Sequence, residues 1–266
     1  MKIKLKVLIV AMFASIILTA CGSKNTTDTS LKDIKEKKEL IIGLDDNFPP
    51  MGFRDKSGEI VGFDIDMAKE VGKRMGVKVT FKPVEWDGVI LSLNNKDIDA
   101  IWNGLTITDT RKKQIAFSKV YLQNKQIIIV KNKSNISSKI DLKDKTVGLQ
   151  MGSSSESALS SDSPLSKSLK EVKKYSNNTE ALLDLNAGRI DAVIVDEVVG
   201  RYYTNKKTGD YKVLNENLGV EDYGVGIRKT DTSLTAEIDK LLGEIKSDGT
   251  ANTISEKWFG KDITNK

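Results

Sequence analysis

Residues 93–101 read LNNKDIDAI and residues 185–193 read LNAGRIDAV, and this internal echo is the stretch on which the fold depends. Each copy passes from a helix end through a turn into an apolar strand. A second echo precedes each copy, because Ile42-Gly43-Leu44-Asp45 is similar to Val147-Gly148-Leu149-Gln150. Two lobes with the same strand–helix topology explain both echoes. Any helix-turn-strand unit gives a similar pattern, so that simpler explanation stays open.

The rest of the chain alternates short β-branched runs with segments of helical period, which predicts an α/β fold with largely parallel sheets. We expect strands at 40–44, 77–81, 98–102, 147–149 and 192–195, and helices at 64–75, 88–93, 155–159, 179–187, 234–245 and 254–259. Ligands of open α/β sheets bind beyond the carboxyl ends of the strands. Asp45 and the pair Asn103-Gly104 lie at such ends in one expected lobe, and Gln150 and Asp196 lie at the matching ends of the other. A cleft between facing lobes would bring these positions together.

The segment from Asn103 to Arg111 reads as a loop running into a helix with Asp109 as its N-cap. An arginine in the first turn of a helix is electrostatically misplaced unless it has an anionic partner. The guanidinium of Arg111 suits a carboxylate, with Thr106 as a further donor and Gly104 allowing close backbone approach. Pairing of Arg111 with Asp109 or another surface acid is the alternative.

A second anion site is expected where Gly152 to Glu156 opens a helix, with Ser153 as the cap and Ser154 beside it. A serine-rich helix start is more often only a cap. Asp196 ends the apolar strand 192–195, where a ligand ammonium would be a suitable partner for its carboxylate. Phe48 and Trp86 are either pocket walls or residues that anchor their loops in the core.

An anion site, a carboxylate and two aromatic side chains at cleft positions suit a free amino acid as ligand. The sequence also resembles the extracellular solute-binding proteins of polar amino-acid ABC transporters, which include glutamine, histidine and lysine-arginine-ornithine binders. The resemblance covers 40–260 and is carried by GEIVGFDID at 58–66, GLTITDTR at 104–111, Asp191-Ala192 with Asp196, and KWFG at 257–260. It implies a two-lobed, Venus-flytrap fold with two crossing hinge strands, near 121–125 and 219–223. Lobe 1 would comprise 36–122 and 223–262, and lobe 2 would comprise 123–222.

The same resemblance implies roles for individual residues. Arg111, Thr106 and the backbone of Gly104 and Ser154 would hold the α-carboxylate, and Asp196 would hold the α-ammonium. Phe48, Trp86 and Asp45 would shape the side-chain pocket. Because burying a lone carboxylate is costly, Asp45 favours a polar or cationic amino acid or cystine. The alternative is that Asp45 pairs with a protein lysine or caps a local turn, which would leave Trp86 to select an apolar ligand. Asn103 departs from the small residue that is common in related binders, and this departure would alter the pocket wall and weaken any transfer of specificity. A permease and an ATPase would be the partners, the protein would be a monomer, and no cofactor is implied.

The amino terminus predicts the compartment. Lys2, Lys4 and Lys6 precede an apolar stretch at 7–18, which reads as a signal peptide over 1–20. Leu18-Thr19-Ala20-Cys21 matches a lipobox, so we expect a lipid on Cys21, a flexible tether over 21–35 and anchoring at the outer face of the cytoplasmic membrane. An ordinary secretory peptide or a single membrane helix with an incidental cysteine is the alternative.

Composition excludes several functions. The chain has no histidine and one cysteine, which excludes histidine-based triads and makes a transition-metal site or an internal disulfide untenable. Its net charge of +5 includes the three amino-terminal lysines, and no basic block suggests nucleic-acid binding. An enzyme on the same scaffold, such as a cyclohexadienyl dehydratase or a lytic transglycosylase, is the main rival, and a sensor or adhesin is the second.

Overall fold

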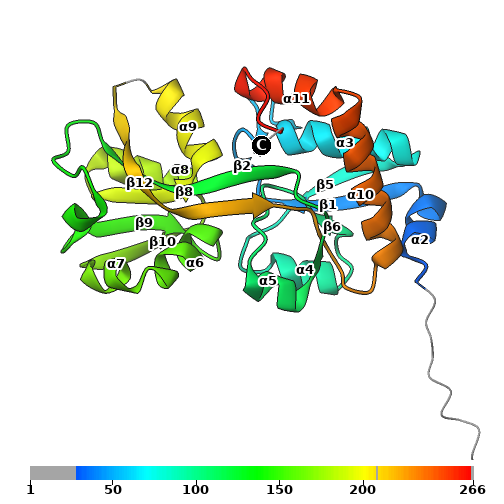
Figure 1. Ribbon diagram of the computed structural model, residues 1–266, viewed down its shortest axis with the longest axis horizontal. Coiled ribbons are helices and arrows are strands. Elements are labelled where there is room, and N and C mark those ends of the chain that lie inside the picture. The colour runs from blue at the N-terminus through cyan, green and yellow to red at the C-terminus, as the bar shows by residue number, and fades with distance from the viewer. Residues whose placement is uncertain (1–27, 208, 265–266) are drawn as a thin grey trace, which may run out of the picture.

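The computed structural model describes residues 28–207 and 209–264, and it has two lobes side by side, joined by two long strands that run across both (Figure 1). The first lobe contains a five-stranded sheet of order β5-β1-β6-β13-β7 and the second a five-stranded sheet of order β10-β9-β11-β8-β12. Helices pack around both sheets, as the α/β prediction requires. The predicted two-lobed α/β fold is confirmed.

The first sheet is formed by β1 (Glu39–Leu44), β5 (Lys78–Pro83), β6 (Ala100–Ile101), β7 (Ala116–Phe117) and β13 (Gly226–Ile227), and a small sheet by β2 (Asn47–Phe48), β3 (Gly52–Arg54) and β4 (Ile60–Val61). The helices of this lobe are α2 (Ser30–Lys37), α3 (Phe63–Met75), α4 (Val89–Asn94), α5 (Asp109–Gln114), α10 (Thr232–Ser247) and α11 (Thr250–Phe259). The second sheet is formed by β8 (Leu122–Lys131), β9 (Thr146–Gln150), β10 (Glu171–Tyr175), β11 (Ala192–Asp196) and β12 (Tyr211–Tyr223). Its helices are α6 (Ser154–Ser161), α7 (Ser163–Ser168), α8 (Asn178–Ala187), α9 (Glu197–Lys206) and a 3-10 turn at Lys139–Leu142.

The internal echo has a specific packing cause in both lobes. Gly43 in β1 and Gly148 in β9 occupy equivalent places, each strand lying between its two parallel neighbours. A Cβ on Gly43 would lie 2.4 Å from Ile98 Cδ1, and a Cβ on Gly148 would lie 2.5 Å from Ile190 Cδ1. Each glycine therefore makes room for an isoleucine that lies two residues before the neighbouring strand, β6 or β11.

The aspartates of the two echoes are equivalent as well. Asp99 Oδ2 accepts from the Ile41 amide at 2.8 Å, and Asp191 Oδ2 accepts from the Thr146 amide at 2.8 Å. A generic helix-turn-strand pattern requires neither this contact nor the glycine–isoleucine packing, so the two-lobe explanation of the echo is the correct one.

The sheets are mixed rather than largely parallel. β9, β10 and β11 run parallel, but β8 is antiparallel to both β11 and β12. The two expected hinge segments pair directly, with Lys125 opposite Val220 and Leu122 opposite Tyr223. The antiparallel strands arise because the chain leaves the first lobe along β8 and returns along β12.

Two local predictions near the ends of helices are wrong. Helix α2 begins at Ser30, inside the stretch 21–35 that was expected to be tether, because Ser30 Oγ lies 3.0 Å from Ser233 Oγ and the helix packs at the start of α10. Thr108, not Asp109, is the N-cap of α5, since its side chain accepts from the Arg111 amide at 3.2 Å. The predicted signal peptide and Cys21 lie outside the described residues.

Candidate functional site

The predicted site residues come from strand ends and loops of both lobes. Asp45 follows β1, Asn103 and Gly104 follow β6, Gln150 and Asp196 end β9 and β11, Ser153 and Ser154 open α6, Thr106 and Arg111 flank the start of α5, Phe48 lies in β2, and Trp86 precedes α4. Contacts join the two groups across the lobes. Gln150 Nε2 donates to Asp45 Oδ2 at 2.7 Å, and an Arg111 nitrogen donates to the Gly152 carbonyl at 3.4 Å. The structure therefore brings strand ends about 100 residues apart in sequence into contact.

Arg111 is a buried cation without an acidic partner. Its guanidinium donates to the Thr106 carbonyl at 3.0 Å and lies 5.3 Å from the centre of the Trp86 ring. Among the described residues no carboxylate lies within ion-pair distance of it, and Asp109 pairs with Lys112 instead. Burial lowers the pKa of Arg111, although the negative charges of Asp196 and Glu221 oppose this effect. A buried guanidinium that forms no ion pair favours an anionic ligand.

Both serine hydroxyls at the start of α6 contact other groups of the protein. Ser153 Oγ donates to the Gln150 carbonyl at 2.7 Å and caps the Glu156 amide, while Ser154 Oγ accepts from Gln126 Nε2 at 3.0 Å. The capping prediction for Ser153 is confirmed. The Ser153 hydroxyl is therefore engaged as a donor, whereas an anion at this helix start could accept from the Ser154 hydroxyl or from backbone amides.

Asp196 is buried, and neutral side-chain donors hold its carboxylate. Its Oδ1 atom accepts from Asn124 Nδ2 at 2.7 Å, Gln126 Nε2 at 2.9 Å and the Tyr223 hydroxyl at 2.6 Å. Burial raises the pKa of Asp196, and the neighbouring negative charge of Glu221 raises it further. No lysine or arginine within the described ranges forms an ion pair with it. A ligand ammonium would supply the missing charge.

Asp45 is the second buried carboxylate. Its Oδ1 accepts from the Asn47 amide at 2.8 Å, a local turn contact, and its Oδ2 accepts from Gln150. Burial raises the pKa of Asp45 from its ordinary 3.8 to about 6, against the opposing effect of these hydrogen bonds. No basic side chain of the described chain pairs with it, so the alternative of a protein lysine as partner does not apply there. The Asp45 carboxylate thus forms a local turn contact and at the same time has no cationic partner among the described residues.

Asn103 supports the site from below instead of lining it. Its side chain is fully buried, and its Oδ1 accepts from the Asp45 amide at 3.1 Å. The expectation that Asn103 alters the pocket wall is therefore replaced by a role in holding the loop after β1. Phe48 and Trp86 contact edge to face with ring centroids 6.3 Å apart, and Trp86 also faces Arg111. Trp86 therefore lies between Arg111, the expected partner of the α-carboxylate, and Phe48, which lies in β2 after Asp45.

Two expected donors are already engaged within the protein. The Gly104 amide donates to Asp64 Oδ2 at 2.6 Å, and the Thr106 hydroxyl donates to Glu221 Oε2 at 2.8 Å. The Gly104 amide is thus not free for a carboxylate, contrary to expectation. Glycine is needed at this position for another reason, since its φ is +59° and a Cβ would lie 3.0 Å from the Tyr223 ring.

Several residues of the site were missed by the sequence analysis. Asn124 and Gln126 on β8, Glu221 and Tyr223 on β12, Asp64 on α3 and Asn178 on α8 all contact predicted site residues. The signal for four of them was the spacing of two residues, which places Asn124 with Gln126, and Glu221 with Tyr223, on one face of each strand.

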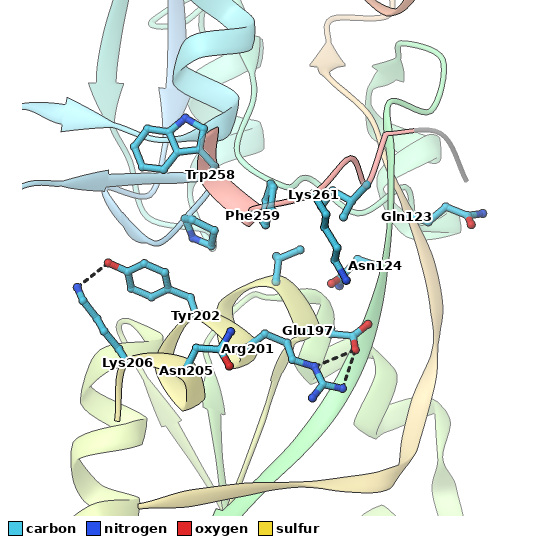
Figure 2. A pocket seen from close by; sticks show the side chains of 13 residues that line it. Gln123, Asn124, Glu197, Arg201, Tyr202, Asn205, Lys206, Trp258, Phe259 and Lys261 are labelled. Carbon is cyan, nitrogen blue, oxygen red and sulfur yellow. Dashed lines mark hydrogen bonds and ion pairs between the residues drawn. The ribbon is translucent and has the colours of Figure 1, made fainter. Parts of the chain in front are cut away.

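A cavity of about 500 Å³ lies between the lobes (Figure 2), away from the predicted site residues. Figure 2 shows it between α9 and the carboxyl-terminal segment, with Tyr202 on one wall and Trp258 and Phe259 on the other. None of the predicted site residues lines it. Over the residues that the structure covers, no cluster of acidic or cysteine side chains is arranged to hold a metal ion, and no helix there is long and apolar enough to cross a membrane.

Comparison with known proteins gives consistent matches. Residues 40–261 match the family described as bacterial extracellular solute-binding proteins, family 3. The L-cystine-binding protein TcyJ of Escherichia coli (strain K12) is 32% identical over 259 residues, covering 96% of each chain. The lysine/arginine/ornithine-binding periplasmic protein of the same strain is 39% identical over 84% of this chain and 88% of its own.

The solved structures agree with these matches. An ABC uptake transporter substrate-binding protein from Streptococcus pneumoniae, crystallised with bound histidine, superposes with a TM-score of 0.87 at 36% identity. The match covers 91% of this chain and all of the other. Because sequence, length and fold all correspond, this chain belongs to family 3 of the bacterial extracellular solute-binding proteins.

Proposed function

We propose that the protein binds a free L-amino acid between its lobes and delivers it to the permease and ATPase of an ABC importer. The observation that carries this proposal is a pair of buried charges, one in each lobe, that form no ion pair with any described side chain. Arg111 is buried without a carboxylate and Asp196 is buried without a cation. The α-carboxylate and α-ammonium of one zwitterion would neutralise both, and closing lobes would remove both from water.

The ligand we propose carries an additional cationic group. Asp45 is a second buried carboxylate, and the charge of a lysine, arginine, ornithine or histidine side chain, or the second ammonium of cystine, would compensate it. The relatives named above bind cystine, basic amino acids or histidine, which supports this class. An aliphatic side chain would leave Asp45 unpaired, so leucine and valine are disfavoured.

We further propose that Cys21 carries a lipid that anchors the protein at the outer face of the cytoplasmic membrane. The lipobox at 18–21 supports this attachment, and the family consists of proteins that act outside the cell. Residues 30–122 with 223–262 and residues 123–222 would be the two bodies that close on the ligand, the first starting at α2.

A thermal-shift screen of the mature protein against all amino acids and cystine tests the proposal. A ligand that binds only the folded state stabilises it by about 2.7 kcal/mol at a hundredfold excess over Kd. We expect L-arginine, L-lysine, L-histidine or L-cystine to raise the melting temperature and L-leucine to leave it unchanged. The absence of a shift with any amino acid would contradict the proposed function.

A further inference from the structure

Glu221 and Asp196 form a pair of neighbouring carboxylates at the point where the hinge strands meet the second lobe. In the register of the sheet, Asp196 on β11 lies opposite Gln126 on β8, and Glu221 on β12 lies opposite Asn124 on β8. Cross-strand neighbours on one face are close enough to share contacts. The two acids therefore face each other across the two amide side chains of β8.

The same two amides bind both carboxylates. Asn124 Nδ2 donates to Asp196 at 2.7 Å and to Glu221 at 3.2 Å, and Gln126 Nε2 donates to them at 2.9 and 3.0 Å. Thr106 and Tyr223 complete the set, with hydroxyls that donate to Glu221 and Asp196 respectively. All of these side-chain donors reach Asp196 through Oδ1 and Glu221 through Oε2. Within the described chain, the second oxygen of each acid receives no side-chain donor.

No positive side chain balances the pair. Neither acid forms an ion pair with a lysine or arginine in the segments that the structure describes. The charged and titratable groups that face Asp196 are Glu221 and Tyr223 on β12 and Arg111 on α5, and β8 presents only neutral amides. Arg111 donates to a backbone carbonyl of the first lobe, so its guanidinium is not held by either acid. Two adjacent carboxylates without a cation repel each other unless a proton or a ligand cation lies between them.

We propose that Glu221 and Asp196 together form a two-carboxylate seat for the ammonium group of the ligand, so that the hinge strand β12 takes part directly in recognition. This inference rests on the proposed amino-acid function and adds a residue to that site. An ammonium has three donors, and no side-chain donor of the described residues occupies the second oxygen of either acid. Burial and the neighbouring charge of Glu221 raise the pKa of Asp196 to about 7, so below this pH its carboxyl holds a proton in the free protein. The ligand ammonium replaces this proton, which passes to the buffer.

The test compares the unmodified protein with Glu221→Gln and with the matched control Asp222→Asn. Glutamine keeps the shape of Glu221 and an oxygen for the donors around it. Asp222 is the next residue on the opposite face of β12, and its side chain accepts from the exposed Gln123 side chain at 3.1 Å. L-arginine is the probe, with L-histidine and L-cystine used in the same way. Calorimetry in phosphate and in Tris, from pH 8 to pH 5.5, gives both the affinity and the number of protons released.

We expect Glu221→Gln to weaken binding at pH 8 by roughly 10- to 100-fold, as for loss of a charged hydrogen-bond acceptor. We also expect it to release fewer protons and to lose less affinity on acidification, because the like charge beside Asp196 is gone. Asp222→Asn should match the unmodified protein. Asp45 and the ligand also take up or release protons, but they do so equally in all three proteins. The difference in proton release between Glu221→Gln and the unmodified protein therefore reports on Glu221 and Asp196.

The outcomes separate this inference from the proposed function. Unchanged affinity and proton release in Glu221→Gln would overturn the two-carboxylate seat while leaving amino-acid binding intact. An equal loss of affinity at every pH, with proton release unchanged, would also overturn it, because Glu221 would then only support Asn124 and Gln126. Failure of the unmodified protein to bind any of the probes would overturn the proposed function and the seat together.

Discussion

Replacing Asp45 by asparagine tests the cationic subsite, because it removes one charge with little change of shape. Asp45 is 9% exposed and its pKa is raised to about 6 by burial, with nearby Glu85 and Asp46 adding to the effect. Keeping such a group ionised at pH 7.5 costs about 3 kcal/mol relative to its ordinary pKa of 3.8. A ligand cation offsets this cost, so we expect Asp45→Asn to lose about 2–4 kcal/mol of L-arginine affinity at pH 7.5.

The pH dependence gives the sharper test, and its sign follows from the raised pKa. A ligand cation needs the ionised form, which is lost as the pH falls through about 6. At pH 5 roughly a tenth of Asp45 is ionised in the free protein, so its contribution to affinity drops about tenfold. Asp45→Asn lacks this loss, and its disadvantage relative to the unmodified protein should therefore shrink about tenfold between pH 7.5 and pH 5.

Isothermal titration calorimetry at both pH values measures these ratios. Asp46→Asn is the matched control, since Asp46 is the neighbouring acid and pairs with Arg54 at 2.6 Å away from the site. It should bind L-arginine almost as the unmodified protein does. A ratio between Asp45→Asn and the unmodified protein that stays constant with pH would refute the reasoning, as would tight binding of leucine by both.

Three further predictions follow from the site and the amino terminus. Arg111→Lys keeps the charge but loses the planar guanidinium, so calorimetry should show a loss of about 2–4 kcal/mol in affinity. Asp196→Asn should show a similar loss. Wild-type binding by both folded variants would mean that the ligand binds elsewhere. Saturating ligand should reduce the radius of gyration in small-angle scattering, because its contacts to both lobes favour the closed form, whereas an unchanged profile would indicate a rigid site. Cys21→Ala should abolish labelling with palmitate in growing cells, and equal labelling of mutant and unmodified protein would exclude lipid attachment at this residue.

Local patterns were sufficient for the two lobes and for several of their elements, but not for the antiparallel strands β8 and β12. Strands β1, β9 and β11 and helices α3, α8 and α10 lie where apolar periodicity predicted them, within a residue or two. In each lobe the repeated glycine contacts the repeated isoleucine because β6 lies beside β1 and β11 lies beside β9. The same packing in both lobes requires the same residues, so the repeat is visible in the sequence. The ends of these strands carry Asp45, Gln150 and Asp196, and parallel strands place such ends at one edge. These positions therefore followed from residue order and period alone.

The contacts of the polar groups depended on tertiary structure. Nothing in the sequence around Gln126 indicates that it bonds Asp196 and Glu221, because the register between strands that lie about 70 and 95 residues apart is set by packing of the whole sheet. The Gly104 amide and the Thr106 hydroxyl are donors in any sequence, and only the folded chain shows that Asp64 and Glu221 already accept from them. Residue type and period thus determined which elements form and where their ends lie. The pairing of buried donors and acceptors was decided by the three-dimensional arrangement, since burial obliges each polar group to find a partner wherever in the chain that partner comes from.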